Sequence, residues 1–80
     1  MVSRDGAQIR KERIQTITQF VISQLYKNEN KISFSRTIAS LEYEIGLRRE
    51  KIVEYINIGA DVGRFVIDNE NDLIKSIDKG

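Results

Sequence analysis

The segment around Gly46 constrains the fold more than any other part of the chain, because it joins two stretches of helical periodicity. Aliphatic residues before it follow the i, i+3, i+7 spacing of one helix face, and aliphatic residues after it are four apart. Glycine is favoured where a helix ends in a left-handed residue. We therefore expect two short helices joined by a tight turn at Gly46, the second running from Arg48 to Ile58 and ending at Gly59. The spaced positions are Ile38, Leu41 and Ile45 on one side and Leu47, Ile52 and Ile56 on the other.

The chain before this pair predicts another helix and a short strand. Residues from Gln8 to Lys27 carry an apolar stripe of helical period, which predicts a first helix. Lys31–Phe34 alternates between polar and apolar residues, which indicates a single strand that pairs with a distant segment. Ser35 follows it, and we expect this hydroxyl to cap the next helix, because serine accepts from the unpaired N–H groups of a first turn.

The end of the chain predicts a hairpin. Arg64–Asp68 is β-branched and aromatic, as is typical of strands, and a polar turn separates it from a second strand at Leu73–Ile77. The segment Asp72–Ile77 is also compatible with a short terminal helix. Eighty residues make one domain. We expect it to span residues 8–80, after a flexible tail at residues 1–7.

Composition narrows the classes of function. The chain has no Cys and no His, which excludes disulfides and thiolate zinc sites and removes the commonest general base near neutral pH. No constellation of the remaining polar residues organises a reaction, so we expect a protein that is not an enzyme and needs no metal or cofactor. No apolar run reaches the length of a membrane span and no signal peptide is apparent, so a cytoplasmic protein without membrane contact is expected.

Charge is distributed unevenly although the net value is only +1. Residues 1–51 hold ten basic and six acidic side chains, whereas residues 52–80 hold three and six. The first part can face a polyanion, and the second would be repelled by one. The same unevenness also arises by chance in short chains, so charge alone does not decide the partner.

The residues from Gly46 to Ile56 resemble the turn and recognition helix of helix-turn-helix proteins, with Leu47, Ile52 and Ile56 at the buried positions. Gly59–Phe65 resembles the end of that helix and the entry to a wing. The order of elements from Gln8 to Ile77 is similar to the winged helix-turn-helix superfamily, in particular to its small archaeal and viral members. The resemblance implies an α+β fold of three helices with a C-terminal β-hairpin wing and a short strand between the first two helices.

The same resemblance implies binding of double-stranded DNA, with the third helix in the major groove, and a role in transcription regulation. Arginine at the N-terminal end of such a helix donates to guanine edges, while hydroxyls and cations at helix starts contact phosphate. A homodimer through the first helix is expected, because two half-sites multiply the few contacts of one domain. The implied DNA-binding residues are Arg48, Arg49 and Lys51 on the third helix, Arg36, Ser35 and Ser33 at the second, and Arg10, Lys11 and Arg13 on the first.

Two departures from the family pattern support an alternative function. Arg48 stands where the family usually places a Ser or Thr cap, and the wing loop Asp68–Asp72 is acidic, which opposes the counterion release that drives DNA binding. The helix itself carries Glu50 and Glu54 beside its cations. The alternative is a protein-interaction module of a larger assembly, which binds a protein partner at the acidic wing and uses Val53 as an apolar contact if that side chain is exposed.

Overall fold

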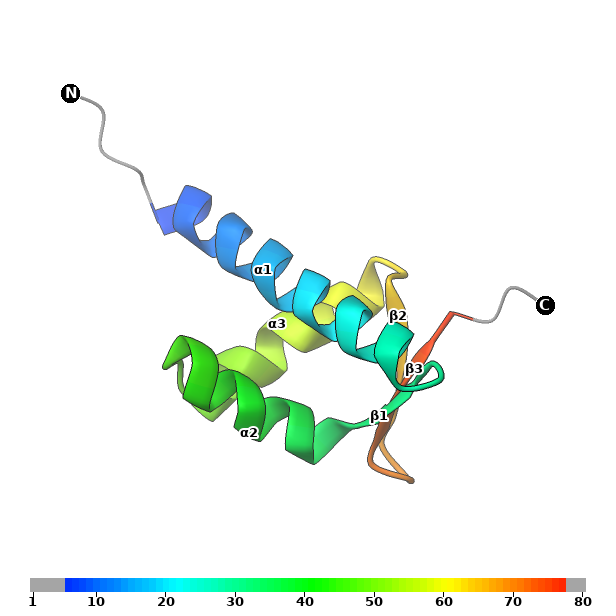
Figure 1. The fold of residues 1–80 in the computed structure, drawn as a ribbon. Coiled ribbons are helices and arrows are strands. Elements are labelled where there is room, and N and C mark those ends of the chain that lie inside the picture. Colours follow the sequence, from blue (N-terminus) through cyan, green and yellow to red (C-terminus); the bar gives the residue numbers. More distant parts are fainter. Residues whose placement is uncertain (1–5, 78–80) are drawn as a thin grey trace.

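The computed structural model describes residues 6–77 and confirms the α+β class (Figure 1). Three helices and a three-stranded antiparallel sheet make a layout compatible with a winged helix that ends in a hairpin. The first helix begins at Gly6, two residues before the predicted start, and the first five residues of the expected tail lie outside the described part. The elements are α1 (Gly6–Lys27), β1 (Lys31–Ser33), α2 (Phe34–Ile45), α3 (Arg49–Asp61), β2 (Phe65–Asp68) and β3 (Leu73–Ser76).

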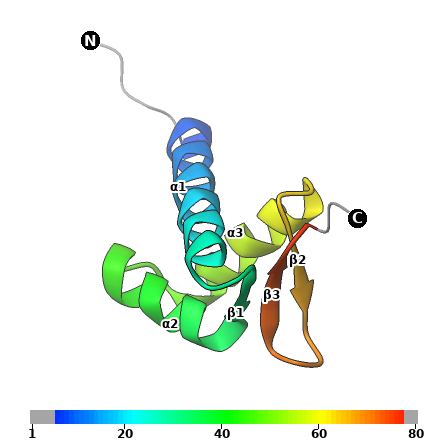
Figure 2. The same ribbon diagram turned by 45° about the vertical axis from the view of Figure 1, so that its right-hand side comes forward.

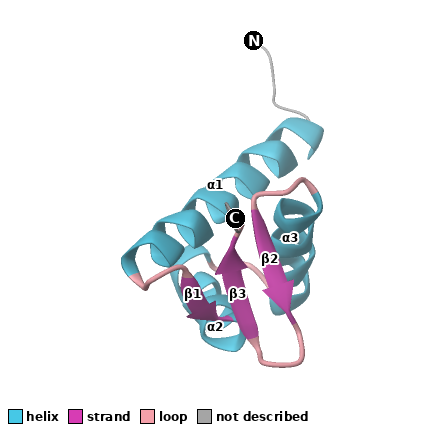
Figure 3. Ribbon diagram, turned by 90° about the vertical axis from the view of Figure 1, so that its right-hand side faces the viewer, coloured by secondary structure: helices cyan, strands magenta, loops and turns pink. Residues whose placement is uncertain are grey.

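The sheet has the strand order β1-β3-β2, with both pairings antiparallel (Figure 3). Leu73–Ser76 is therefore a strand, which decides between the two structures predicted for this segment. The prediction that the short strand pairs with a distant segment is confirmed, since Ile32 lies opposite Ile74 of β3. Ile74 in turn lies opposite Ile67 of β2, so one aliphatic row crosses the sheet on the side facing the helices.

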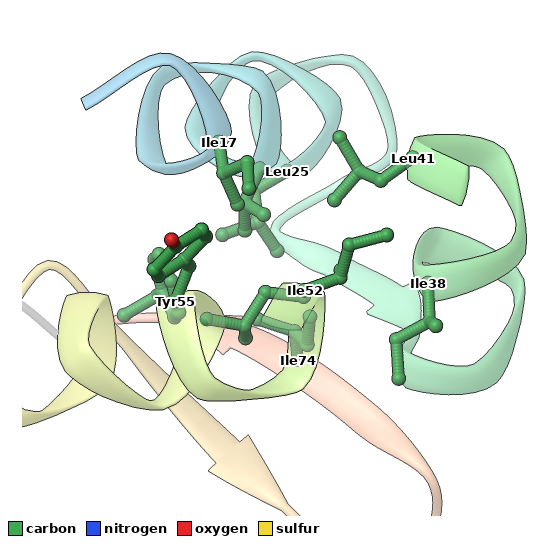
Figure 4. Packing of buried hydrophobic residues seen from close by; sticks show 10 residues of the cluster. Ile17, Leu25, Ile38, Leu41, Ile52, Tyr55 and Ile74 are labelled. Carbon is green, nitrogen blue, oxygen red and sulfur yellow. The ribbon is translucent and has the colours of Figure 1, made fainter. Parts of the chain in front are cut away.

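The core forms where the three helices and this sheet face meet (Figures 2 and 4). α1 and α2 both pack against α3, and the β2–β3 hairpin contacts all three helices. The helical spacings read from the sequence predicted most of these positions, because an amphipathic helix buries its apolar stripe. The buried hydrophobic residues are Ile17, Val21, Leu25, Ile38, Leu41, Ile52, Tyr55, Ile56, Phe65 and Ile74.

The N-cap of α2 is Ser33, so the prediction that Ser35 caps this helix is wrong. The Ser33 hydroxyl accepts from the Arg36 N–H at 3.2 Å, and the Thr37 hydroxyl donates to the Ser33 carbonyl at 2.6 Å. The reason is that β1 runs into α2 without a linker. Ser33, with a ψ of 130°, is the last extended residue before the helix, and the helix already includes Ser35.

Gly46 and Gly59 were both predicted to end helices, and only the prediction for Gly46 is confirmed. Gly46 has a φ of +80° and its N–H donates to the Glu42 carbonyl at 2.9 Å, which confirms the predicted end of α2. α3 does not end at Gly59 but continues to Asp61. The left-handed residue is Gly63, with a φ of +87° and an N–H that donates to the Ala60 carbonyl. The Arg64 N–H donates to the Gly59 carbonyl, which completes a Schellman motif.

Gly59 is instead required for packing between α3 and β2. A Cβ at this position would lie 2.7 Å from the Cζ atom of Phe65, which is itself buried, and 3.1 Å from the Thr18 hydroxyl. The absence of a side chain therefore lets the Phe65 ring lie directly on the helix.

Candidate nucleic-acid interface

The N-terminal turn of α3 is exposed and no side chain caps it. Arg48 occupies the N-cap position with extended backbone, and its carbonyl accepts the first helical bond, from the Ile52 N–H at 3.1 Å. The first N–H groups of any helix have no partner within the helix, and the helix dipole adds partial positive charge there. This turn can therefore receive an anion or an acceptor atom of a base edge.

The cations around this turn are only weakly engaged. The Arg49 Nε lies 3.9 Å from Glu42 Oε1, and the Lys51 Nζ lies 3.7 Å from Glu54 Oε1, both between exposed side chains. Exposed pairs at such distances contribute little to stability. Arg48 is exposed and forms no ion pair within residues 6–77. All three predicted contact residues of α3 are thus available to a ligand.

The solvent side of α3 is acidic along its length. The buried positions of this helix are Ile52, Tyr55, Ile56 and Gly59. On the opposite side, residues spaced i, i+4, i+7 and i+11 share one face. A helix laid lengthwise on a duplex by this side would bring three carboxylates toward phosphate, of which Glu54 is paired with Arg10 and Lys51. The N-terminal end, where Glu50 is the one carboxylate of the first turn, suits a polyanion better than the side does. The residues of that face are Glu50, Glu54, Asn57 and Asp61.

Arg10 joins α1 to α3. Its guanidinium donates to Glu54 Oε2 at 2.7 Å and lies 6.0 Å from the centre of the Tyr55 ring. The hydrogen bond from Arg10, together with the nearby charge of Lys51, lowers the pKa of Glu54. The structure thus gives Arg10 an internal partner, unlike the free phosphate contact expected from the sequence. Lys11 and Arg13 are exposed on α1.

The N-terminus of α2 is filled by a carboxylate from the wing. Asp72 Oδ1 accepts from the Ser35 hydroxyl at 2.8 Å and the Ser35 N–H at 3.2 Å, and its Oδ2 accepts from the Ser33 hydroxyl at 3.2 Å. The Phe34 N–H donates to the Asp72 carbonyl at 2.9 Å. The place where the sequence predicted a phosphate therefore holds an internal anion. Arg36, in the same turn, remains exposed.

The wing loop is less acidic toward solvent than its sequence indicates. Asp68 accepts from the Asn71 side chain at 2.8 Å and from the Asn71 N–H at 3.2 Å, and it pairs with the Lys75 Nζ at 3.2 Å. The hydrogen bond from the Asn71 side chain, followed by that from Lys75, lowers the pKa of Asp68. With Asp72 engaged as well, Glu70 is the one carboxylate of this loop that has no partner within residues 6–77.

Replacing Asp72 with alanine should destabilise the protein by about 1–2 kcal/mol, because the N-terminus of α2 loses its anionic partner and two serine hydroxyls lose their acceptor. Asp72→Asn is the matched control. It keeps an acceptor oxygen and a side chain that tolerates the φ of +55°, so it should recover part of the loss. Urea unfolding followed by circular dichroism measures both variants. Equal stability of Asp72→Ala and wild type would show that the carboxylate does not hold the wing to α2.

Two further expectations concern the surface. Val53 is half-buried against the core, so it is not the exposed apolar contact considered for a protein partner. Among residues 6–77, none of the helices has the length and apolar character needed to cross a bilayer.

Two contacts were not predicted from the sequence: that of Asp72 with the N-terminus of α2, and that of Arg10 on α1 with Glu54 on α3. Asp72 is separated from Ser35 by 37 residues, and Arg10 from Glu54 by 44, so no local pattern signals either contact.

Comparison with protein-family models, curated proteins and solved structures finds no match to this chain.

Proposed function

We propose that this protein is a cytoplasmic winged helix-turn-helix protein that binds double-stranded DNA with the N-terminal end of α3 in the major groove, as a regulator or architectural protein. The observation that supports this most strongly is the uncapped first turn of α3, which presents Arg48, Arg49 and Lys51 to solvent. Unpaired N–H groups, a helix dipole and three cations against one carboxylate, Glu50, favour an anionic partner at this turn.

The charge pattern of α3 favours contact of the duplex with the N-terminal end of the helix rather than with its side. Arg48 and Arg49 enter first and donate to base edges or phosphate, while Lys51 contacts phosphate beside them. Tilting the helix away from the duplex keeps Asp61 in solvent, whereas Glu50, in the first turn beside Arg49, opposes part of the attraction. Arg36 adds a phosphate contact from α2, and the wing loop contributes little, because its remaining free carboxylate is repelled.

A titration of labelled duplex DNA at several salt concentrations tests the proposal. Three or four phosphate contacts predict a log–log slope of affinity against salt of about −3. Affinity that does not depend on salt, or the absence of binding at the lowest salt concentration, would exclude DNA as the partner of this surface.

The outer face of α1 supports a homodimer as the DNA-binding unit. No charged residue occurs between Ile14 and Tyr26, although 31% of the chain is charged. Thr16, Gln19 and Ser23 of this stretch are exposed and share one helix face. The centre of protein interfaces is depleted of charge. We propose that two copies pack α1 against α1 through this face.

Introducing a charge at Gln19 should disrupt this dimer. Gln19→Glu brings like charges together across the two-fold axis, and the dimer dissociation constant should rise by about tenfold or more. Sedimentation equilibrium measures the change, and Tyr43→Glu is the matched control, since Tyr43 is 88% exposed on α2. A monomeric wild type at high concentration, or equal effects of the two variants, would remove α1 as the dimer interface.

A further inference from the structure

A hollow lies where the last turns of α1 pass the open end of the sheet. It lies at the end of the β2–β3 hairpin opposite the wing loop, and none of its lining residues comes from α2 or α3. The lining combines aliphatic and aromatic side chains with three cations. The members that matter are Ile22, Tyr26 and Ile77 on the apolar part and Lys31, Arg64 and Lys75 on the charged part.

Two of these cations face each other across the sheet. Lys31 lies directly opposite Lys75 in the β1–β3 pairing, on the outer side, because the neighbouring Ile32 and Ile74 point into the core. Like charges at opposed positions destabilise a sheet. The Lys75 pair with Asp68 offsets part of this repulsion, whereas Lys31 forms no ion pair within residues 6–77. An external anion beside Lys31 would relieve the remaining repulsion.

The rest of the lining reinforces the positive charge and adds apolar surface. Glu29 is the one carboxylate among the lining residues, and Arg64 is exposed. Tyr26 is 87% exposed and Ile77 is 44% exposed, so two large apolar side chains stand beside the cations. A ligand that fits this surface carries anionic groups next to an apolar group.

We propose that this hollow binds an acidic peptide segment of a partner protein. An aliphatic or aromatic side chain of the peptide packs on Ile22, Tyr26 and Ile77, and the flanking carboxylates pair with Lys31 and Arg64. A nucleic acid fits less well, because it has no aliphatic side chain to pack on the apolar part of the hollow. The proposal uses none of the α3 residues, so it stands or fails independently of the DNA contacts proposed for the N-terminal end of α3.

Fluorescence anisotropy with a labelled eight-residue peptide that alternates Asp or Glu with Leu or Phe tests this proposal. The peptide should bind the full chain, and a version with serine at the apolar positions should bind about tenfold more weakly. Lys31→Gln and Arg64→Gln should each lower the affinity by about fivefold or more. Lys27→Gln is the matched control, since Lys27 is exposed on α1 but does not line the hollow, and it should change the affinity by less than about twofold.

Thermal unfolding separates loss of binding from loss of fold. Lys31→Gln removes the repulsion with Lys75, so its midpoint should equal or exceed that of wild type while peptide binding falls. Three results would overturn the proposal: no binding of the acidic peptide, equal binding by Lys31→Gln and Lys27→Gln, or displacement of the peptide by a single-stranded oligonucleotide that binds more tightly through the same residues. The last result would assign the hollow to nucleic acid.

Discussion

Removing both arginines at the start of α3 should weaken the binding of duplex DNA by about 100-fold, since each arginine contact to a base or phosphate contributes about 1–3 kcal/mol. Arg48→Ala/Arg49→Ala should also make the log–log salt slope less negative by about 2, because two phosphate-neutralising charges are lost. Anisotropy titrations of wild type and variant across a salt series measure both quantities. The expected loss of affinity is large because both side chains are available to DNA: Arg49 has an internal partner only at 3.9 Å, and Arg48 has no ion-pair partner within residues 6–77.

A charge-conserving variant separates base reading from simple attraction. Arg48→Lys/Arg49→Lys keeps two cations but loses the planar fork that donates to guanine, so the salt slope should remain while discrimination between duplex sequences falls. If the double alanine variant binds DNA as wild type does, the N-terminus of α3 is not the contact surface.

Valine in place of Gly59 should destabilise the protein by about 3 kcal/mol, since overpacking a tight core position typically costs 1–3 kcal/mol and the new side chain exceeds a single methyl group. Even a Cβ would lie 2.7 Å from the Phe65 ring. The ring is buried and cannot move outward without opening the β2 contact with α3. Urea unfolding monitored by circular dichroism gives the loss, and Gly59→Ala should show a smaller one, because alanine also improves helix propensity.

The control for this prediction is Ala39→Val. Ala39 is exposed on α2, so valine there reports only the helix propensity of a β-branched residue, about 0.7 kcal/mol or less. If Gly59→Val is no less stable than Ala39→Val, the close approach of Phe65 to α3 does not exist in solution.

The two glycines that follow aliphatic runs show how far sequence reasoning reaches. Gly46 and Gly59 have the same local context, an apolar helical stretch followed by glycine, and both were predicted as helix ends. Only Gly46 is one, with its φ of +80°. Gly59 lies within the helix, where Phe65, six residues later, packs onto it, and Gly63 provides the left-handed residue instead. Periodicity predicts which face of a helix is buried, but the end of the helix depends on what packs there.

The candidate site likewise contains positions that the local sequence predicts and contacts that it does not. The basic turn at Arg48 and Arg49 is local, so its position at the start of a helix followed from spacing. Ser35 is hydrogen-bonded to Asp72, and Arg10 to Glu54, so neither is a free phosphate contact. Both contacts join segments that meet only in the folded chain. The acidic side of α3 could be predicted only in part from the local sequence. Helical spacing relates its members, but the last of them is Asp61, which enters only because the helix is longer than predicted.

An NMR titration with duplex DNA tests most directly whether the N-terminal end of α3 is the DNA-binding surface. The chain has no proline, so each residue after the first contributes a backbone amide signal to a nitrogen-15 correlation spectrum. We expect the largest shift changes at residues 48–52 and at Arg36, with small changes at Asn57 and Asp61 on the acidic side. Changes confined to the N-terminal half of α1 or to the outer face of the sheet would contradict this expectation, as would a spectrum that DNA does not alter.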